Sequence, residues 1–454
     1  MLNNVKSKLI LKTILNNIKN KLKLNIIRHN MILIKRLNIT TYDFKIYETL
    51  KEFNKNLKLN IEDIDIKELN LSNKNIKNKE LELLTKFEFK DLNKLDLSYN
   101  EISDIKVLEI VKYEKLEKLY LGINKITDVN ILKKVNFKDL KILVLSNNKI
   151  SDIKVLENVK FKNLEKLYLN NNKISDINIL ENTNFKELKE LNLSFNKISD
   201  IKVFENVKFE KLEKLFLICN NISDINSLSK AKFEKLEILD LSRNKISDIN
   251  ALENPNFKEL KMLGLTVNKI SDITVLEKAK FENLKKLYLN KNNISDINVL
   301  EKVKFEKLNI LYLCYNEISD INIFEKVGFK KLETLDLSFN QISDINVLER
   351  VNFKELKNLY LSYNKISDIK VLEQVKFEKL DTLYLSHNII SNIDIFENTN
   401  FKNLKNICLD NNKLSDIKVF EKVQFRGLKE LNLDNNSIKQ DEKKKILNLF
   451  NLYH

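Results

Sequence analysis

The sequence contains very few of the residues that usually end secondary-structure elements and build turns. Its 454 residues include only four glycines and one proline, and tryptophan is absent. A chain of this length would ordinarily fold as two or three domains, with many turns that need glycine or proline. The composition therefore argues against an ordinary multi-domain globular protein, although 43% hydrophobic residues are enough for a core.

Long apolar runs and paired cysteines are also missing. No run approaches the roughly 18 residues of a membrane span, and the lysine-containing start MLNNVKSKLILKTILNNIKN does not have the pattern of a secretory signal. The three cysteines, Cys219, Cys314 and Cys408, are odd in number and lie about four repeats apart in the periodic pattern described below, too far for disulfides. We therefore expect free thiols and a cytoplasmic protein.

Motifs for catalysis or cofactor binding are absent as well. Of the three histidines, His29, His387 and His454, none has cysteine or acidic neighbours at the spacing of a metal site or a catalytic triad. Four glycines cannot supply a phosphate-binding loop. We expect no enzyme, no catalytic residues, no cofactor, no metal and no small-molecule substrate, and we interpret His387 as an ordinary surface histidine.

The net charge of +15 is concentrated at one end of the chain. Residues 1–60 hold thirteen Lys and Arg against three Asp and Glu, a net charge of +10, which leaves +5 for the other 394 residues. The basic character therefore belongs mostly to a short N-terminal module, and we do not expect a nucleic-acid partner, because no aromatic platform accompanies these lysines.

One repeating pattern fills most of the chain. The letters KISDIN occur at 173–178 and again at 245–250. Fifteen asparagines, from Asn100 to Asn436, follow one another at intervals of 24 residues. An aromatic position from Phe89 to Phe425 keeps the same interval. A fixed period of this length is typical of a solenoid, in which each unit buries its apolar side against its neighbours.

Each unit contains a short strand followed by a helical segment. In LNKLDLSYNEI, the alternation of Leu95 and Leu97 predicts a strand with both leucines on one side. Apolar residues then recur every third position, as on one stripe of a helix, and Asp104 is placed to cap the first turn. We expect Asn100 to take the place of glycine by bonding to buried turns. The column of aspartates could suggest metal sites, but capping explains every copy.

The pattern Leu-x-x-Leu-x-Leu-x-x-Asn-x-Ile, followed by SDI and a leucine, resembles the leucine-rich-repeat family. It is most similar to the short-repeat branch that contains the internalins and the leucine-rich regulators of protein phosphatase 1. The resemblance implies an α/β solenoid, a horseshoe or arc with a concave parallel β-sheet and short helices on the convex side. It also implies a protein-interaction role, and regulation of a phosphatase is one alternative.

The ends of the chain depart from the repeat. We predict a basic helical module in residues 1–60, one degenerate and about fifteen regular repeats in 61–436, and a helical C-terminal cap in 437–454. The N-terminal module is interpreted as a cap. Its apolar spacing also resembles an F-box, which would make the chain a substrate receptor of a ubiquitin ligase. A mitochondrial presequence is a further alternative, because residues 1–42 contain no acid.

The variable positions of the strands predict a functional surface, because their side chains point outward from the concave face. Exposed aromatic residues gather there, and tyrosine is enriched in binding surfaces. The predicted partner-binding residues are Tyr288, Tyr312, Tyr315, Asp336, Phe339, Tyr360, Tyr363 and Tyr384. We expect a monomeric scaffold that binds another protein, with no membrane contact; alternatively, neighbouring rings stack on one another and only cover the sheet.

Overall fold

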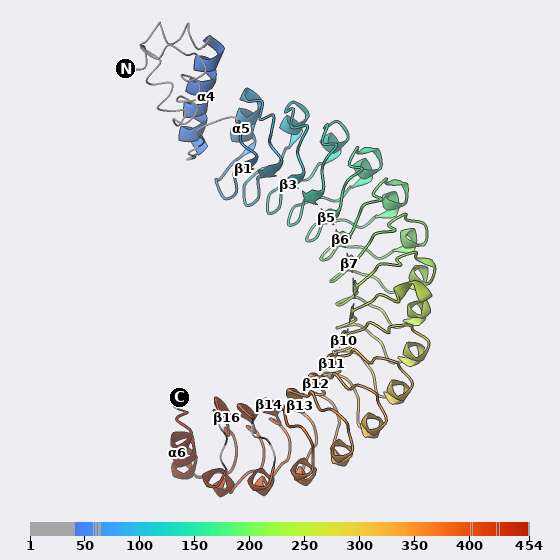
Figure 1. The fold of residues 1–454 in the computed structure, drawn as a ribbon, viewed down its shortest axis with the longest axis vertical. Helices are drawn as coiled ribbons and strands as arrows, with labels where there is room; N and C mark the ends of the chain where they lie inside the picture. Colours follow the sequence, from blue (N-terminus) through green and yellow to red (C-terminus); the bar gives the residue numbers. More distant parts are fainter. Residues whose placement is uncertain are drawn as a thin grey trace, which may run out of the picture. The chain divides into compact units, whose positions relative to one another are not determined.

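The structure is a computed structural model in which the chain forms two compact units, one ending at Leu188 and the other beginning at Lys189 (Figure 1). It describes residues 41–57, 59, 61, 65–399, 401, 403–423, 425 and 427–452, with side chains from residue 49 onward. The predictions for residues 1–40, including the F-box-like helices and the presequence, lie outside the described residues.

The first unit contains five short parallel strands, each pairing with its neighbour in sequence. They are β1 (Glu68–Asn70), β2 (Lys94–Asp96), β3 (Lys118–Tyr120), β4 (Ile142–Val144) and β5 (Lys166–Tyr168). The register sets equivalent residues side by side, so that Leu69 of the degenerate first repeat lies opposite Leu95. The middle residue of each strand is buried and its neighbours are partly or fully exposed, which is the alternation that Leu-x-Leu predicts.

The second unit continues the same arrangement with eleven parallel strands in sequence order. They are β6 (Glu190–Asn192), β7 (Lys214–Phe216), β8 (Ile238–Asp240), β9 (Met262–Gly264), β10 (Lys286–Tyr288), β11 (Ile310–Tyr312), β12 (Thr334–Asp336), β13 (Asn358–Tyr360), β14 (Thr382–Tyr384), β15 (Asn406–Cys408) and β16 (Glu430–Asn432). Within this unit the strands lie on the inner side of the curve and the helical turns on its outer side (Figure 1). The predicted solenoid of parallel strands and short helical turns is confirmed.

The helical segments are 3-10 turns of three to five residues, so the expectation of a helical stripe needs correction. They are η2 (Glu82–Lys86), η3 (Lys106–Glu109), η4 (Asn130–Lys133), η5 (Lys154–Asn158), η6 (Asn178–Asn182), η7 (Lys202–Glu205), η8 (Asn226–Lys230), η9 (Asn250–Glu253), η10 (Pro255–Phe257), η11 (Thr274–Glu277), η12 (Asn298–Glu301), η13 (Asn322–Glu325), η14 (Asn346–Glu349), η15 (Lys370–Glu373), η16 (Asp394–Glu397) and η17 (Lys418–Glu421). An interval of three residues, as between Ile105 and Leu108, is one turn of a 3-10 helix.

The predicted capping role of the aspartates is confirmed. Asp104 Oδ1 accepts a hydrogen bond of 2.8 Å from the backbone N–H of Lys106, the first residue of η3. In the single repeat that replaces this aspartate, Asn392 Oδ1 accepts from the N–H of Asp394 at the same distance. An amide oxygen serves as well as a carboxylate because the contact needs one acceptor.

Within the described residues, three α-helices lie outside the repeated pattern. They are α4 (Thr41–Leu57), α5 (Asn78–Leu81) and α6 (Gln440–Leu449). In α4, Leu50, Phe53 and Leu57 are buried, and the Phe53 ring lies 5.0 Å from Phe87 in an edge-to-face contact. In α6, Ile446 is buried. Helices α4 and α6 thus each bury apolar side chains next to the adjoining repeats. No helix in the described part of the chain is long and apolar enough to cross a membrane.

The asparagine column joins adjacent repeats as expected. Asn268 Nδ2 donates to the carbonyls of Leu241 and Leu265, each at 3.1 Å, and its Oδ1 accepts from the N–H of Ile246 at 3.0 Å. One buried side chain therefore satisfies backbone groups of two repeats, and the same contacts recur along the column.

We predict that Asn268→Ala lowers the free energy of unfolding by about 1–3 kcal/mol, because buried backbone groups of two turns lose their partners. Lys269 is the adjacent exposed residue, and Lys269→Ala should change stability by less than about 0.5 kcal/mol. Denaturant unfolding of both variants measures the difference, and equal losses would contradict the role assigned to the asparagine.

Candidate functional site

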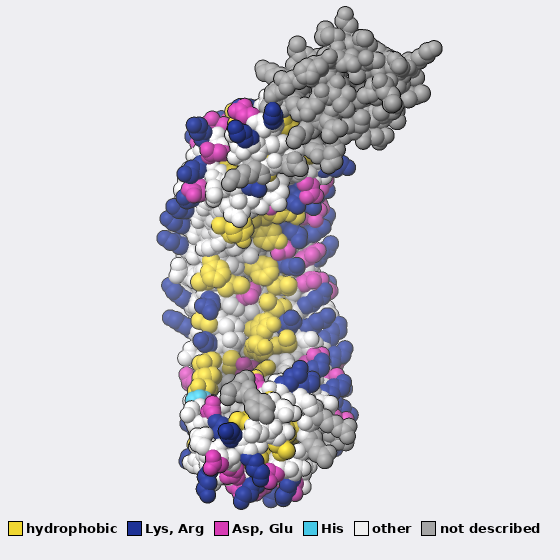
Figure 2. All heavy atoms as spheres, turned by 90° about the vertical axis from the view of Figure 1, so that its left-hand side faces the viewer, with side chains coloured by type: hydrophobic (Ala, Val, Ile, Leu, Met, Phe, Trp, Pro, Cys, Tyr) yellow, Lys and Arg dark blue, Asp and Glu magenta, His cyan; other side chains and the backbone are white. Residues whose placement is uncertain are grey.

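The eight predicted partner-binding residues belong to the second unit, on strands β10–β14 and the turns that follow β11–β13. Five of them end consecutive strands: Tyr288, Tyr312, Asp336, Tyr360 and Tyr384. The other three, Tyr315, Phe339 and Tyr363, follow three residues after a strand end. All eight side chains are half-buried or exposed. Figure 2 shows hydrophobic side chains gathered along the middle of this face, with lysine and arginine along its margins.

The strand-end tyrosines form two edge-to-face pairs around one carboxylate. The ring centres of Tyr288 and Tyr312 lie 5.3 Å apart, and those of Tyr360 and Tyr384 lie 5.2 Å apart. Asp336 is the register neighbour of both Tyr312 and Tyr360. Burial raises the pKa of the Tyr312 hydroxyl, and the Asp336 charge raises it further. The structure therefore places these five residues on adjacent strands, with Asp336 between the two pairs.

The second aromatic column occupies a strained backbone position. Tyr315, Phe339, Tyr363 and His387 have φ angles between 53° and 56°, in the left-handed region. The expectation that the asparagine column alone replaces glycine was therefore incomplete, because the residue before each asparagine makes the left-handed turn. The left-handed conformation costs a non-glycine residue roughly 1–2 kcal/mol of conformational energy, since its Cβ crowds a carbonyl oxygen.

The side chains of this column form one stack of four rings. Ring centres are 3.8 Å apart between Tyr315 and Phe339, and the next two intervals, to Tyr363 and then His387, are 3.9 and 3.8 Å. The ring planes are tilted by only 10–13° from one repeat to the next. His387 was interpreted from sequence as a plain surface histidine, and the structure makes it the last ring of the stack. Its membership of the stack could have been inferred from its position, which lies in the same 24-residue column as the other three rings.

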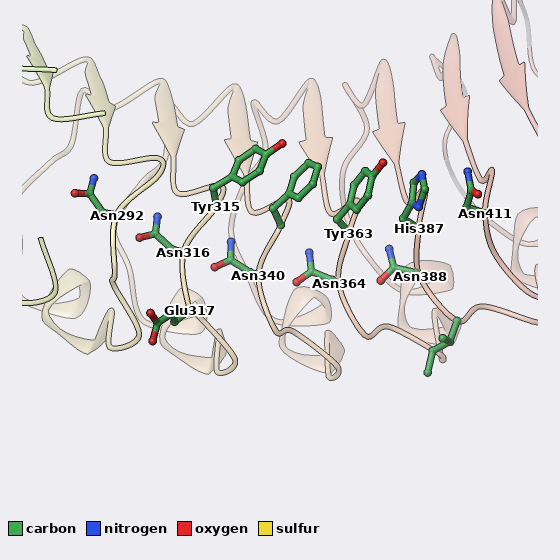
Figure 3. A pocket seen from close by; sticks show the side chains of 12 residues that line it. Asn292, Tyr315, Asn316, Glu317, Asn340, Tyr363, Asn364, His387, Asn388 and Asn411 are labelled. Atoms are coloured by element: carbon green, nitrogen blue, oxygen red, sulfur yellow. The ribbon is translucent and has the colours of Figure 1, made fainter. Parts of the chain in front are cut away.

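An open groove of about 810 Å³ runs beside the ring stack. Figure 3 shows the stacked rings as one row and the asparagine column as a parallel row below it. The asparagine amides are occupied by backbone contacts, for example Asn340 with the carbonyls of Leu313 and Leu337. The groove therefore offers ring edges and saturated amides, with Glu317 and Ile389 also in its lining.

Ionisable side chains that were not singled out from the sequence lie at the two ends of this surface. Lys291 Nζ lies 4.7 Å from the centre of the Tyr315 ring. At the other end, Glu430 accepts hydrogen bonds from the Tyr384 hydroxyl at 3.0 Å and from the Cys408 thiol at 3.3 Å. The contact between Glu430 and Tyr384 joins different positions of the unit across two repeats. The 24-residue columns of the sequence align only equivalent positions, so they do not indicate this contact.

The site has little reactive chemistry. The three cysteines are free. Burial raises the pKa of the Cys314 thiol, and the neighbouring Asp336 carboxylate adds to the shift, so this thiol stays protonated and is a poor nucleophile at neutral pH. Among the residues that the structure describes, no three His, Cys, Asp or Glu side chains lie close enough to hold a metal ion. The arrangement is suited to non-covalent contact.

Comparison with protein families assigns the repeats. A model described as Leucine Rich repeats (2 copies) matches residues 114–158, 138–182, 162–206, 210–254, 306–350 and 354–398. A second model, Leucine Rich repeat, matches residues 90–105. Together these matches cover more than half of the chain. The chain belongs to the leucine-rich-repeat family.

Solved leucine-rich-repeat structures resemble this chain over most of its length. A leucine-rich-repeat protein of Leptospira interrogans is 28% identical with a TM-score of 0.71, covering 89% of this chain and 97% of that one. The internalin InlF of Listeria monocytogenes is 28% identical with a TM-score of 0.58, covering 79% and 94%. A plant peptide hormone receptor, RGFR1 in complex with RGF2, shares the fold at 20% identity and a TM-score of 0.51, covering 83% and 68%. No match was found among curated proteins.

The residues that precede the asparagine column have left-handed backbones, and this leads to a stability prediction. Val267 is one of them, with a φ of 56° and a β-branched side chain. Asparagine tolerates this conformation better, so Val267→Asn should raise the free energy of unfolding by about 1 kcal/mol. The reverse change at an equivalent position, Asn411→Val, should lower it by a similar amount. Denaturant unfolding measures both variants, and a loss of stability in Val267→Asn would show that the left-handed backbone carries no cost there.

Proposed function

We propose that this leucine-rich-repeat protein is a non-enzymatic scaffold that binds another protein across the inner face of strands β10–β14. The observation that carries the proposal is the paired aromatic surface, two tyrosine pairs and a ring stack on five successive repeats. A partner that presents an arginine or lysine flanked by apolar groups fits this surface. Charge attraction to Asp336, cation–π contact and aromatic burial would act together.

The cost of displaying the rings supports a binding role over simple cover for the sheet. Tyr315 and Tyr363 leave 41% and 40% of their surface exposed, so both rings are accessible to a partner. Asparagine occupies the same left-handed position at Asn411 and Asn435, where it needs no aromatic contact. The left-handed position recurs from repeat to repeat, so the conformation alone marks no site, but here aromatic rings hold it in three successive repeats at a cost that asparagine would reduce.

Helix α4 is relevant to the choice between a plain scaffold and the alternative functions. Leu50, Phe53 and Leu57 of α4 are buried, which supports a capping role for this segment. Docking of a ubiquitin-ligase adaptor by an F-box-like segment in residues 1–45 and regulation of a phosphatase stay secondary hypotheses. The three free thiols are consistent with the cytoplasmic, monomeric protein that we propose.

We expect Tyr312→Ala or Tyr360→Ala to weaken partner binding by at least about 1–2 kcal/mol, the usual size for an aromatic residue at the centre of an interface. The loss of one edge-to-face contact should lower stability by no more than about 0.5–1.5 kcal/mol beyond the lost burial. Binding curves for a partner captured from cells, together with denaturant unfolding of the same variants, separate the two effects.

Tyr168 provides the control, because it ends strand β5 in the equivalent position of the first unit. Tyr168→Ala should weaken binding less than either substitution in the second unit. If Tyr312→Ala and Tyr360→Ala bind like the unmodified protein, the aromatic surface only covers the sheet. The same capture experiment tests the ubiquitin-ligase alternative, since an adaptor and a cullin should co-purify only if that alternative is correct.

A further inference from the structure

The aromatic surface on β10–β14 has ionisable side chains of opposite sign at its two ends. Lys286 and Lys291 lie at the β10 end, at the start of the strand and just after it. Asp410 and Glu430 lie beyond β14, after β15 and at the start of β16. Charges placed on a binding surface in this way set the orientation of a partner more than its affinity.

The two lysines at the β10 end have no acidic partner within the described residues. At two other strand starts the lysine pairs with an acid of the preceding repeat, Lys94 with Glu68 at 3.0 Å and Lys214 with Glu190 at 3.5 Å. The register neighbours of Lys286 are a methionine and an isoleucine, and its side chain is exposed. Lys291 is also exposed, and its Nζ lies over the face of Tyr315. The positive charge at this end is therefore available to a partner.

The two acids at the other end lack a Lys or Arg partner among the described residues. Glu430 accepts from Tyr384 and Cys408, which are neutral donors. Asp410 Oδ2 accepts from Asn411 Nδ2 at 2.8 Å and lies 3.8 Å from Nε2 of His387, and its Oδ1 accepts from the Ser386 hydroxyl. The Asp410 side chain keeps 15% of its surface exposed, and Glu430 is half-buried. This end therefore carries two carboxylates without a Lys or Arg partner, one of them, Asp410, beside the last ring of the stack.

We infer that the partner contributes an extended segment that crosses the strands in one direction, with an acidic group over Lys286 and Lys291 and a basic group over Asp410 and Glu430. The inference rests on the proposed function and specifies its partner. Five strand intervals separate β10 from β15, which Asp410 follows, about 24 Å at ~4.8 Å each, and Glu430 at the start of β16 lies one interval further. An extended chain rising ~3.3 Å per residue spans this distance in about seven residues.

The position of Asp336 adds a third element to the segment. Asp336 ends β12, two strand intervals from β10, which corresponds to about three residues of an extended chain. The segment should therefore carry an acidic residue, a cationic residue about three positions away, and a second basic residue about four positions further. A uniformly basic segment would meet the unpaired lysines, and a uniformly acidic one would meet the three carboxylates, so neither fits the whole surface.

Selection of random twelve-residue peptides displayed on phage, with the full chain as target, tests the inference. Peptides that bind the unmodified chain but not Tyr312→Ala should carry acidic and basic residues in one constant order. For a synthetic peptide from this set, the double variant Lys286→Glu, Lys291→Glu should lose about tenfold or more in affinity. Replacing the peptide's acidic residue with lysine should restore binding to the double variant. Lys269→Glu, at an exposed lysine outside this surface, should change affinity by less than about twofold.

The outcomes distinguish the two proposals. If the selected peptides require Tyr312 but show no charge order, or if the double lysine variant binds them unchanged, the partner's charge pattern is wrong while the aromatic surface stands. If no selected peptide requires Tyr312, the aromatic surface itself is overturned, and the charge pattern with it.

Discussion

The repeat depends on one asparagine side chain, which bonds to backbone groups in two adjacent turns. Asn340 accepts from the N–H of Ile318 in the preceding repeat, and donates to a carbonyl there and to two of its own. Because each copy needs the next turn at one distance and orientation, the turns stack in strict register. The same register aligns every other position of the 24-residue unit into a column with neighbours one strand apart.

Because of this alignment, charged and aromatic side chains contact equivalent or nearby positions of the next repeat, and the same contacts recur along the solenoid. Lysines pair with acids 24 or 25 residues away, as in Lys125 with Glu101 at 3.0 Å and Lys302 with Glu277 at 3.1 Å. Such exposed pairs contribute little individually, so they keep the surface neutral more than they stabilise it. Lys286 and Lys291 take no part in this pairing within the described residues, so their charges stay exposed to solvent.

The sequence was sufficient for the fold because its main signals are repeated and local. Leu95, Leu97 and Asn100 recur in the same order in each unit, and the period alone predicts parallel neighbours in register. The left-handed turn could not be predicted in the same way. Glycine and asparagine are the residues that indicate such a turn, whereas Phe339 and Tyr363 are found there. The helical turns were taken for ordinary helix because a segment as short as η3 gives too few residues to separate a period of 3.0 from 3.6.

The candidate surface was predictable in position but not in geometry, and the geometry assigns different roles to its two aromatic columns. In the stack, Phe339 and Tyr363 have both ring faces covered by neighbours, so they present only their edges. The strand-end tyrosines meet edge to face in pairs, so their ring faces are not covered on both sides as in the stack. Since a cation is attracted to a ring face, the strand-end tyrosines suit recognition of a charged side chain. The stack suits contact with the apolar part of the same segment, because its shape is set by the backbone beneath it.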